Sequence, residues 1–124
     1  MGVAYHTHYL VWCEVGRTDF IRTLGRSYAS LEEIGILLVV AEAEIRYGAA
    51  ARYDDEIRVL TRLEKVQSRA VTFAYEILRG EGDGAQRLAT ARTRLVATGQ
   101  SGVPRSLPMD LIERFREVLA NIPS

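Results

Sequence analysis

The first residues with chemically useful side chains are two histidines and a glutamate near the start of the chain. His6 and His8 stand two positions apart, and Glu14 follows in the same predicted helix. A metal pair needs converging ligands, but side chains two apart on a helix do not face each other, and no third ligand stands out. We therefore expect no metal site. Glu14 lies amid apolar residues of this helix, which suggests a buried carboxylate. It is either a general base or the partner of an ion pair with Arg17 or with another chain, and we favour the ion pair.

Other groups suit the stabilisation or binding of anions. A helix that begins near Tyr5 to Thr7 offers backbone N–H groups and a partial positive charge, which can stabilise an oxyanion, although most helix starts bind nothing. Three arginines, at positions 52, 69 and 105, could bind phosphates, although exposed arginines usually contact only water. Cys13, the only cysteine, has no evident activating base and is expected to be a core residue.

One long helix is predicted to organise these groups. The stretch from Gly2 to Gly25 reads as a tight turn followed by that helix, and the residues from Tyr9 to Cys13 make its first turns apolar almost all round. A surface helix has one apolar stripe, so this helix is expected to be wrapped by other structure. Gly16 costs about 1 kcal/mol of helix propensity relative to Ala, which suggests close approach of a neighbouring backbone.

The remaining pattern predicts a single α+β domain over residues 1–124. A short helix is expected at Ser27–Ile34, with Ser30 and Glu33 at capping-box spacing. Alternating apolar residues then predict four strands that form an antiparallel meander, and Pro108 suits the start of a last helix. The predicted strands and last helix are Ile36–Tyr47, Glu56–Val66, Ser68–Arg79, Gln86–Ala97 and Met109–Asn121.

Composition narrows the class of protein. The chain has 124 residues, with sixteen basic and sixteen acidic side chains. Its net charge is therefore zero, and it has no overall positive charge that would attract nucleic acid. Its longest apolar run, Ile36–Ala41, is too short to span a bilayer, and no signal segment opens the chain. We expect a cytoplasmic protein without membrane insertion.

Three motifs, in this order, resemble those of the hotdog-fold acyl-CoA thioesterases. They are GVAYHTHYLVWCEVGRTDF, RYGAAARYDDEI and SRAVTFAYEIL, and the resemblance covers Gly2 to about Pro108. It is strongest to the 4-hydroxybenzoyl-CoA and Tol-Pal-associated branch. The resemblance implies an antiparallel sheet wrapped around a central helix, and hydrolysis of a CoA thioester to free acid and CoA. It also implies a homo-oligomer, dimeric or tetrameric, with coenzyme A as part of the substrate and no further cofactor.

The resemblance also assigns roles by position. Tyr5 and His6 match the family's Y-H pair, with the backbone amide near His6 as the oxyanion donor, and Glu14 matches the helix motif. Arg52 matches the loop motif, and Ser68 and Arg69 match the strand that borders the CoA groove. Arg105 is our additional candidate for a phosphate contact.

Departures from the family pattern suggest a weak enzyme. His8 replaces an Asn, Ala50 replaces a Pro, and the family's catalytic Asp and first strand would precede Met1. We therefore expect weak hydrolysis or none, and a gain of at least about a hundredfold on extending the chain upstream to include that Asp. The alternatives are a catalytically weak acyl-CoA-binding protein and, less favoured, a hotdog dehydratase. Acyl-CoA turnover and hydration of an enoyl substrate distinguish the three.

Overall fold

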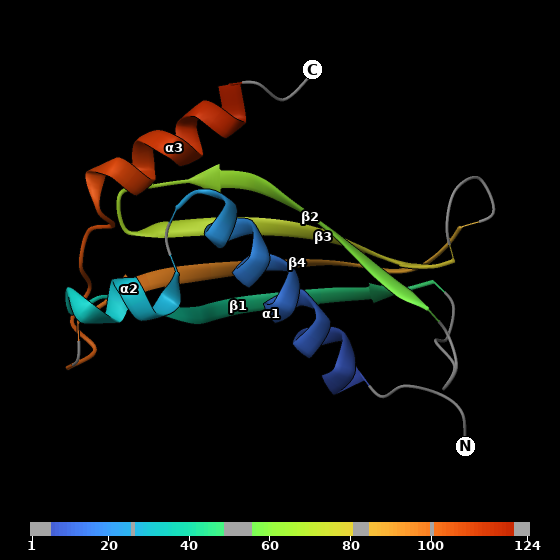
Figure 1. Cartoon of the computed structure of the whole chain (residues 1–124). Helices are drawn as coiled ribbons and strands as arrows, with labels where there is room; N and C mark the ends of the chain where they lie inside the picture. Colours follow the sequence, from blue (N-terminus) through green and yellow to red (C-terminus); the bar gives the residue numbers. More distant parts are fainter. Residues whose placement is uncertain (1–5, 26, 49–55, 81–84, 100, 121–124) are drawn as a thin grey trace.

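The protein is one antiparallel sheet with helices packed on one of its faces (Figure 1). The computed structural model describes residues 6–25, 27–48, 56–80, 85–99 and 101–120. All the predicted elements are present, with ends within two residues of those expected wherever the end is described. They are α1 (His6–Thr23), α2 (Tyr28–Glu33), β1 (Leu37–Tyr47), β2 (Ile57–Val66), β3 (Ala70–Arg79), β4 (Gln86–Thr98) and α3 (Met109–Ala120).

The strand order is β1-β4-β3-β2, with every neighbouring pair antiparallel. The predicted neighbours β2–β3 and β3–β4 are confirmed, but the simple meander is wrong for β1. That strand pairs with β4, from Leu37 opposite Thr98 to Tyr47 opposite Ala89. β1 and β2 are therefore the two edge strands of the sheet.

The core is centred on β3 and Phe73. Six consecutive residues of β3, from Ala70 to Tyr75, are buried. The Phe73 ring is fully buried and meets Phe20 of α1 and Phe115 of α3 edge-on, at centroid distances of 5.6 and 6.2 Å. Helices from both ends of the chain therefore pack on one aromatic side chain of the central sheet.

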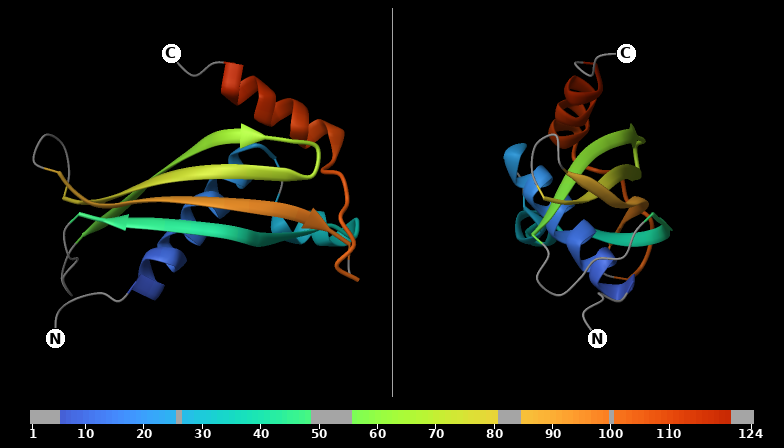
Figure 2. Two further views of the ribbon diagram at one scale, coloured as in Figure 1. Left: turned by 180° about the vertical axis from the view of Figure 1, so that it is seen from behind. Right: turned by 90° about the vertical axis from the view of Figure 1, so that its right-hand side faces the viewer.

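Helix α1 lies across one face of the sheet rather than inside it (Figure 2). Among the side chains of α1 that the structure describes, the buried ones recur every four residues and form one stripe: Tyr9, Cys13, Arg17 and Ile21. Val11 and Val15 are more than half exposed, so the prediction of an all-round buried helix is wrong for a single chain. Cys13 is a core residue, as expected, and burial raises the pKa of its thiol to about 11.

The short helix α2 is capped one turn earlier than predicted. Ser27 is the N-cap residue: the Ser27 hydroxyl accepts a hydrogen bond from the Ser30 amide, and the Ser30 hydroxyl accepts one from the Ser27 amide. The capping box of α2 therefore consists of Ser27 and Ser30, and the prediction of Ser30 with Glu33 is wrong. A serine can replace the usual Glu at the third helical position because its hydroxyl reaches back to the cap amide.

Gly16 is where α1 approaches β2 most closely. A Cβ atom at this position would overlap the Thr61 hydroxyl oxygen and lie 3.1 Å from Cγ1 of Val59. Gly16 therefore does serve close packing, as expected, but the neighbours are side chains of β2 and not a backbone.

We expect Gly16→Ala to destabilise the protein even though alanine is the better helix former. The gain in helix propensity is about 1 kcal/mol, while overpacking a core contact costs about 1–3 kcal/mol. In a Thr61→Ala background the overlapping hydroxyl is gone, so there Gly16→Ala should become neutral or stabilising. Urea unfolding of the four variants measures this, and the same loss in both backgrounds would contradict the contact with Thr61.

Candidate active site

The start of α1 is anchored over one end of the sheet. Tyr9, in the first helical turn, meets Tyr47 at the end of β1 edge-on, with ring centroids 5.0 Å apart. The first-turn amides have no carbonyl partner within the helix, and this turn contains no acidic residue. The backbone at His6 and Thr7 is therefore suited to stabilise an oxyanion, and this role stays a prediction. Tyr5 and Arg52 lie outside the described residues, and for His6 the structure describes the backbone.

Glu14 is exposed, so it is not the carboxylate enclosed by apolar residues that the sequence suggested. It lies eight residues beyond His6, about 12 Å along the helix axis. It borders a crevice of about 220 Å³ between α1, α2 and the start of β1. The other lining residues are Arg17, Leu31, Glu32, Ile36, Leu37, Leu38 and Leu95. Within one chain, Glu14 is thus too far from the helix start to act on a carbonyl bound there.

A buried polar cluster of Arg17, Tyr75 and Thr93 lies between α1 and the sheet, and the sequence did not predict it. Only 8% of the Arg17 surface is exposed, and this residue lies beside the Tyr75 hydroxyl, which also shares a 2.6 Å hydrogen bond with Thr93 Oγ1. Burial raises the pKa of Tyr75, although Thr93 and Arg17 partly oppose this effect, so the hydroxyl is neutral at pH 7. Arg17 follows Cys13 by four residues, and this spacing was a signal that the arginine faces the sheet.

Ser68, Arg69 and Arg105 come together at one end of the sheet. The Ser68 carbonyl accepts a 2.8 Å hydrogen bond from the Leu107 amide, and the Arg69 carbonyl accepts one from the Ala97 amide. The Arg105 guanidinium donates to the carbonyls of Ile34 and Gly35, at 3.2 and 3.0 Å. All three side chains are exposed. Arg69 and Ser68 are available to a ligand, whereas part of Arg105 is already occupied by the end of α2.

The helix start and this trio lie at opposite ends of the sheet (Figure 1). Tyr47, which contacts Tyr9 at the helix start, aligns across β4 with Ile77 of β3. Ser68 lies two residues before the other end of β3. The seven residue steps from Ile77 to Ala70 span about 24 Å. The predicted catalytic and CoA-binding residues therefore form two separate groups in one chain.

Among the described residues, no helix has the length and apolar character needed to cross a membrane.

Comparison with known proteins gives a family match over nearly the whole chain. Residues 1–119 match the profile of the thioesterase-like superfamily. The putative acyl-CoA thioesterase YneP of Bacillus subtilis is 36% identical over 83 residues, which span 67% of this chain but 60% of that relative. The acyl-CoA thioester hydrolase YbgC of Escherichia coli O157:H7 is 26% identical over 117 residues, covering 94% of this chain and 85% of YbgC.

Solved structures agree with the family match. The DHNA-CoA thioesterase of Staphylococcus aureus superimposes with a TM-score of 0.89 and 32% identity, covering 97% of this chain and 81% of that enzyme. A hypothetical protein from Thermus thermophilus gives a TM-score of 0.82 with 31% identity, covering 95% of this chain and 86% of that protein. The expected α+β hotdog fold is confirmed, and the chain belongs to the thioesterase-like superfamily.

Proposed function

We propose that this protein hydrolyses acyl-CoA thioesters to free acid and CoA. The observation that carries the proposal is the start of α1, whose first turn contains no acidic residue and packs on Tyr47 through Tyr9. Two of those amides can hold the thioester oxygen while water attacks the carbonyl carbon. The C–S bond then breaks and CoA leaves as its thiol. The names of the relatives, which include acyl-CoA and DHNA-CoA thioesterases, support this class of substrate.

We further propose that each site is shared by two copies of the chain. β1 is an edge strand of eleven residues, and the exposed large hydrophobic residues Val39, Val40 and Tyr47 lie on it. An unpaired edge of this length is a hazard unless another strand covers it. Two copies related by a two-fold axis must pair their β1 strands antiparallel.

This pairing would bring the predicted catalytic residues of one copy near the predicted CoA-binding residues of the other. The Tyr47 end of one β1, with its helix start, would lie beside the Leu37 end of the other β1. That end adjoins the crevice bordered by Glu14, and Ser68 and Arg69 lie at the same end of the sheet. Glu14 of the second copy is then the carboxylate placed to activate water, and Ser68 and Arg69 lie toward the nucleotide end of CoA.

Arg69→Ala should weaken the binding of CoA by about 1–3 kcal/mol, the value of a hydrogen bond to a charged group. Calorimetric titration with CoA measures the change. Arg116→Ala on α3 removes an exposed arginine from another element and serves as the control. Equal affinities for the wild type and Arg69→Ala would remove Arg69 from the site.

The test of function is thiol release from a panel of aromatic and aliphatic acyl-CoAs. If Glu14 is the base, Glu14→Gln should lower turnover by about 10²–10⁴-fold without changing the fold. Turnover that survives Glu14→Gln would assign proton transfer to another group. No thiol release from any substrate, with CoA still bound, would leave the binding alternative.

A further inference from the structure

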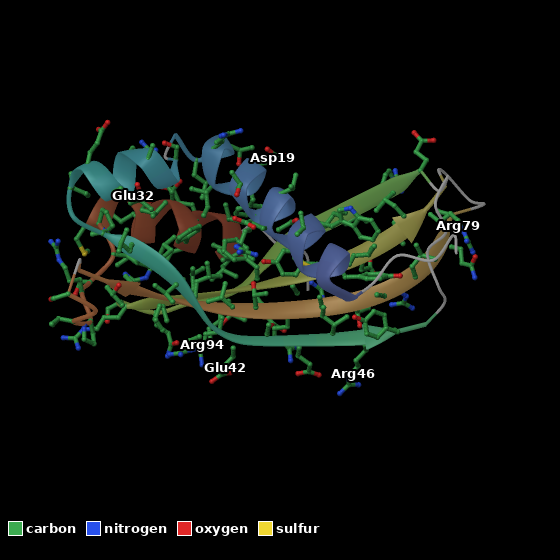
Figure 3. The ribbon with its side chains drawn as sticks, turned by 90° about the horizontal axis from the view of Figure 1, so that it is seen from below. Asp19, Glu32, Glu42, Arg46, Arg79 and Arg94 are labelled. Atoms are coloured by element: carbon green, nitrogen blue, oxygen red, sulfur yellow. The ribbon has the colours of Figure 1, made fainter. Side chains whose placement is uncertain are left out.

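The sheet has a second face, on which no described helix lies (Figure 2). Figure 3 shows Glu42, Arg46 and Arg94 on this open face, away from Asp19 and Glu32 of the helices. Strand alternation and the pairing register assign four acidic and seven basic side chains to it. The acidic ones are Glu42, Glu44, Glu64 and Glu76, and the basic ones are Arg46, Arg58, Arg62, Lys65, Arg87, Arg92 and Arg94. Since the whole chain is neutral, the open face carries a local excess of positive charge.

A hollow of about 500 Å³ lies in this face, within the range of about 300–1,000 Å³ typical of small-molecule sites. It forms because short side chains, Ala74 and Thr90, occupy the middle strands while long ones surround them. Arg92 and Arg62 flank Ala74 in one row across the sheet. The charged residues in its lining are Glu44, Arg46, Arg62, Glu76, Arg87 and Arg92.

Ion pairs restrain three of the four arginines. Arg92 donates two hydrogen bonds to Glu64, at 2.5 and 2.6 Å, and this pair spans β3. Arg46 pairs with Glu44 at 3.1 Å, and Arg87 pairs with Glu76 at 3.4 Å. A guanidinium has five N–H donors, so each arginine retains donors beyond those its carboxylate accepts. Within the described ranges, Arg62 forms no ion pair.

We infer that this hollow binds the diphosphate group of a nucleotide. Four arginines face three carboxylates, two in the lining and the Glu64 that pairs with Arg92, so one net positive charge remains. The N–H donors that these ion pairs do not use can bind the oxygens of a diphosphate. Leu60, 47% exposed in the same lining, offers apolar surface to a base. A second copy of this face is a poorer occupant, because two faces with the same excess charge repel each other. The site lies on the other side of the sheet from the α1 helix, so it does not depend on the proposed hydrolysis.

Calorimetric titration of the full chain with pyrophosphate tests the inference, with ADP and CoA as further arms. Pyrophosphate should bind in a saturable manner, and Arg62→Gln should weaken that binding at least about tenfold. Arg22→Gln, which removes an exposed arginine of α1 on the opposite face, should leave it unchanged. Pyrophosphate binding that remains in Arg62→Gln and is lost when Arg69→Gln is added belongs to the proposed CoA groove, which separates the two sites. Tighter binding of ADP than of pyrophosphate would show that the ligand is a nucleotide. Loss of CoA binding in Arg62→Gln would show that this nucleotide is part of CoA, the product of the proposed hydrolysis.

Three results would overturn the inference. The first is the absence of saturable pyrophosphate binding, and the second is an equal loss in Arg22→Gln and Arg62→Gln, which would reveal a general effect of net charge. The third is a change of oligomeric state in Arg62→Gln, measured by sedimentation, because it would make the open face an interface between copies.

Discussion

Replacing His6 with proline should reduce acyl-CoA hydrolysis by about 10²–10³-fold while leaving the fold intact, because it deletes one oxyanion donor. Proline has no backbone N–H, but it is well tolerated at the first position of a helix, where that N–H has no partner within the helix. His6 is the first residue of α1, so the substitution removes an amide without breaking the helix. The measurement is kcat for thiol release, together with the unfolding midpoint of the same sample.

His6→Ala is the matched control, because it removes the imidazole and keeps the backbone N–H. Retained activity in His6→Ala with loss in His6→Pro would assign catalysis to the amide. Equal losses in both variants would assign it to the side chain. Full activity in His6→Pro would remove this amide from the mechanism.

Whether two copies share each site can be tested by combining variants in one dimer. In a mixed dimer of His6→Pro with Arg69→Ala, one site holds both defects and the other holds neither. Mixing and refolding equal amounts should therefore restore roughly a quarter of the wild-type kcat/KM, since half the dimers are mixed. A mixture no more active than its components would place each site within one chain.

Much of the fold could be predicted because it is encoded in local periodicity. The alternation in β1 and β2 and the apolar stripe of α3 each depend on side chains within one element. The pairing of β1 was not predictable in this way. A meander and the observed order use the same four alternating segments, and they differ in whether β1 pairs with β2 or with β4.

The sequence named candidate site residues, but it did not indicate how they lie relative to one another. The sequence motifs named His6, Glu14 and Arg69, and the structure shows that they occupy separate regions of one chain. Val11 and Val15 show the same limit, because apolar residues all round α1 indicate burial without identifying what buries them. If a second copy covers these valines, the expectation that α1 is buried on all sides holds for the assembly and not for the single chain.

Phe73→Ala is expected to be among the most destabilising single substitutions in the protein, with a loss of about 3–5 kcal/mol. Phe73 is fully buried, and its ring contacts Phe20, Tyr75 and Phe115, so truncation leaves a cavity bordered by three aromatic rings. Because these rings belong to α1, β3 and α3, the cavity cannot close without moving both helices. Urea unfolding followed by circular dichroism measures the loss.

Val103→Ala is the control for apolar truncation without a cavity. Val103 is 59% exposed, so its loss should change the free energy of unfolding by less than about 0.5 kcal/mol. The comparison also separates two arrangements of the core. If Phe73 joins α1 and α3 to the sheet, as the ring contacts indicate, Phe73→Ala should lower the unfolding midpoint for the whole chain in one transition. A small loss in Phe73→Ala would mean that Phe20 and Phe115 can close on each other, and that the two helices are not held in place by the central strand.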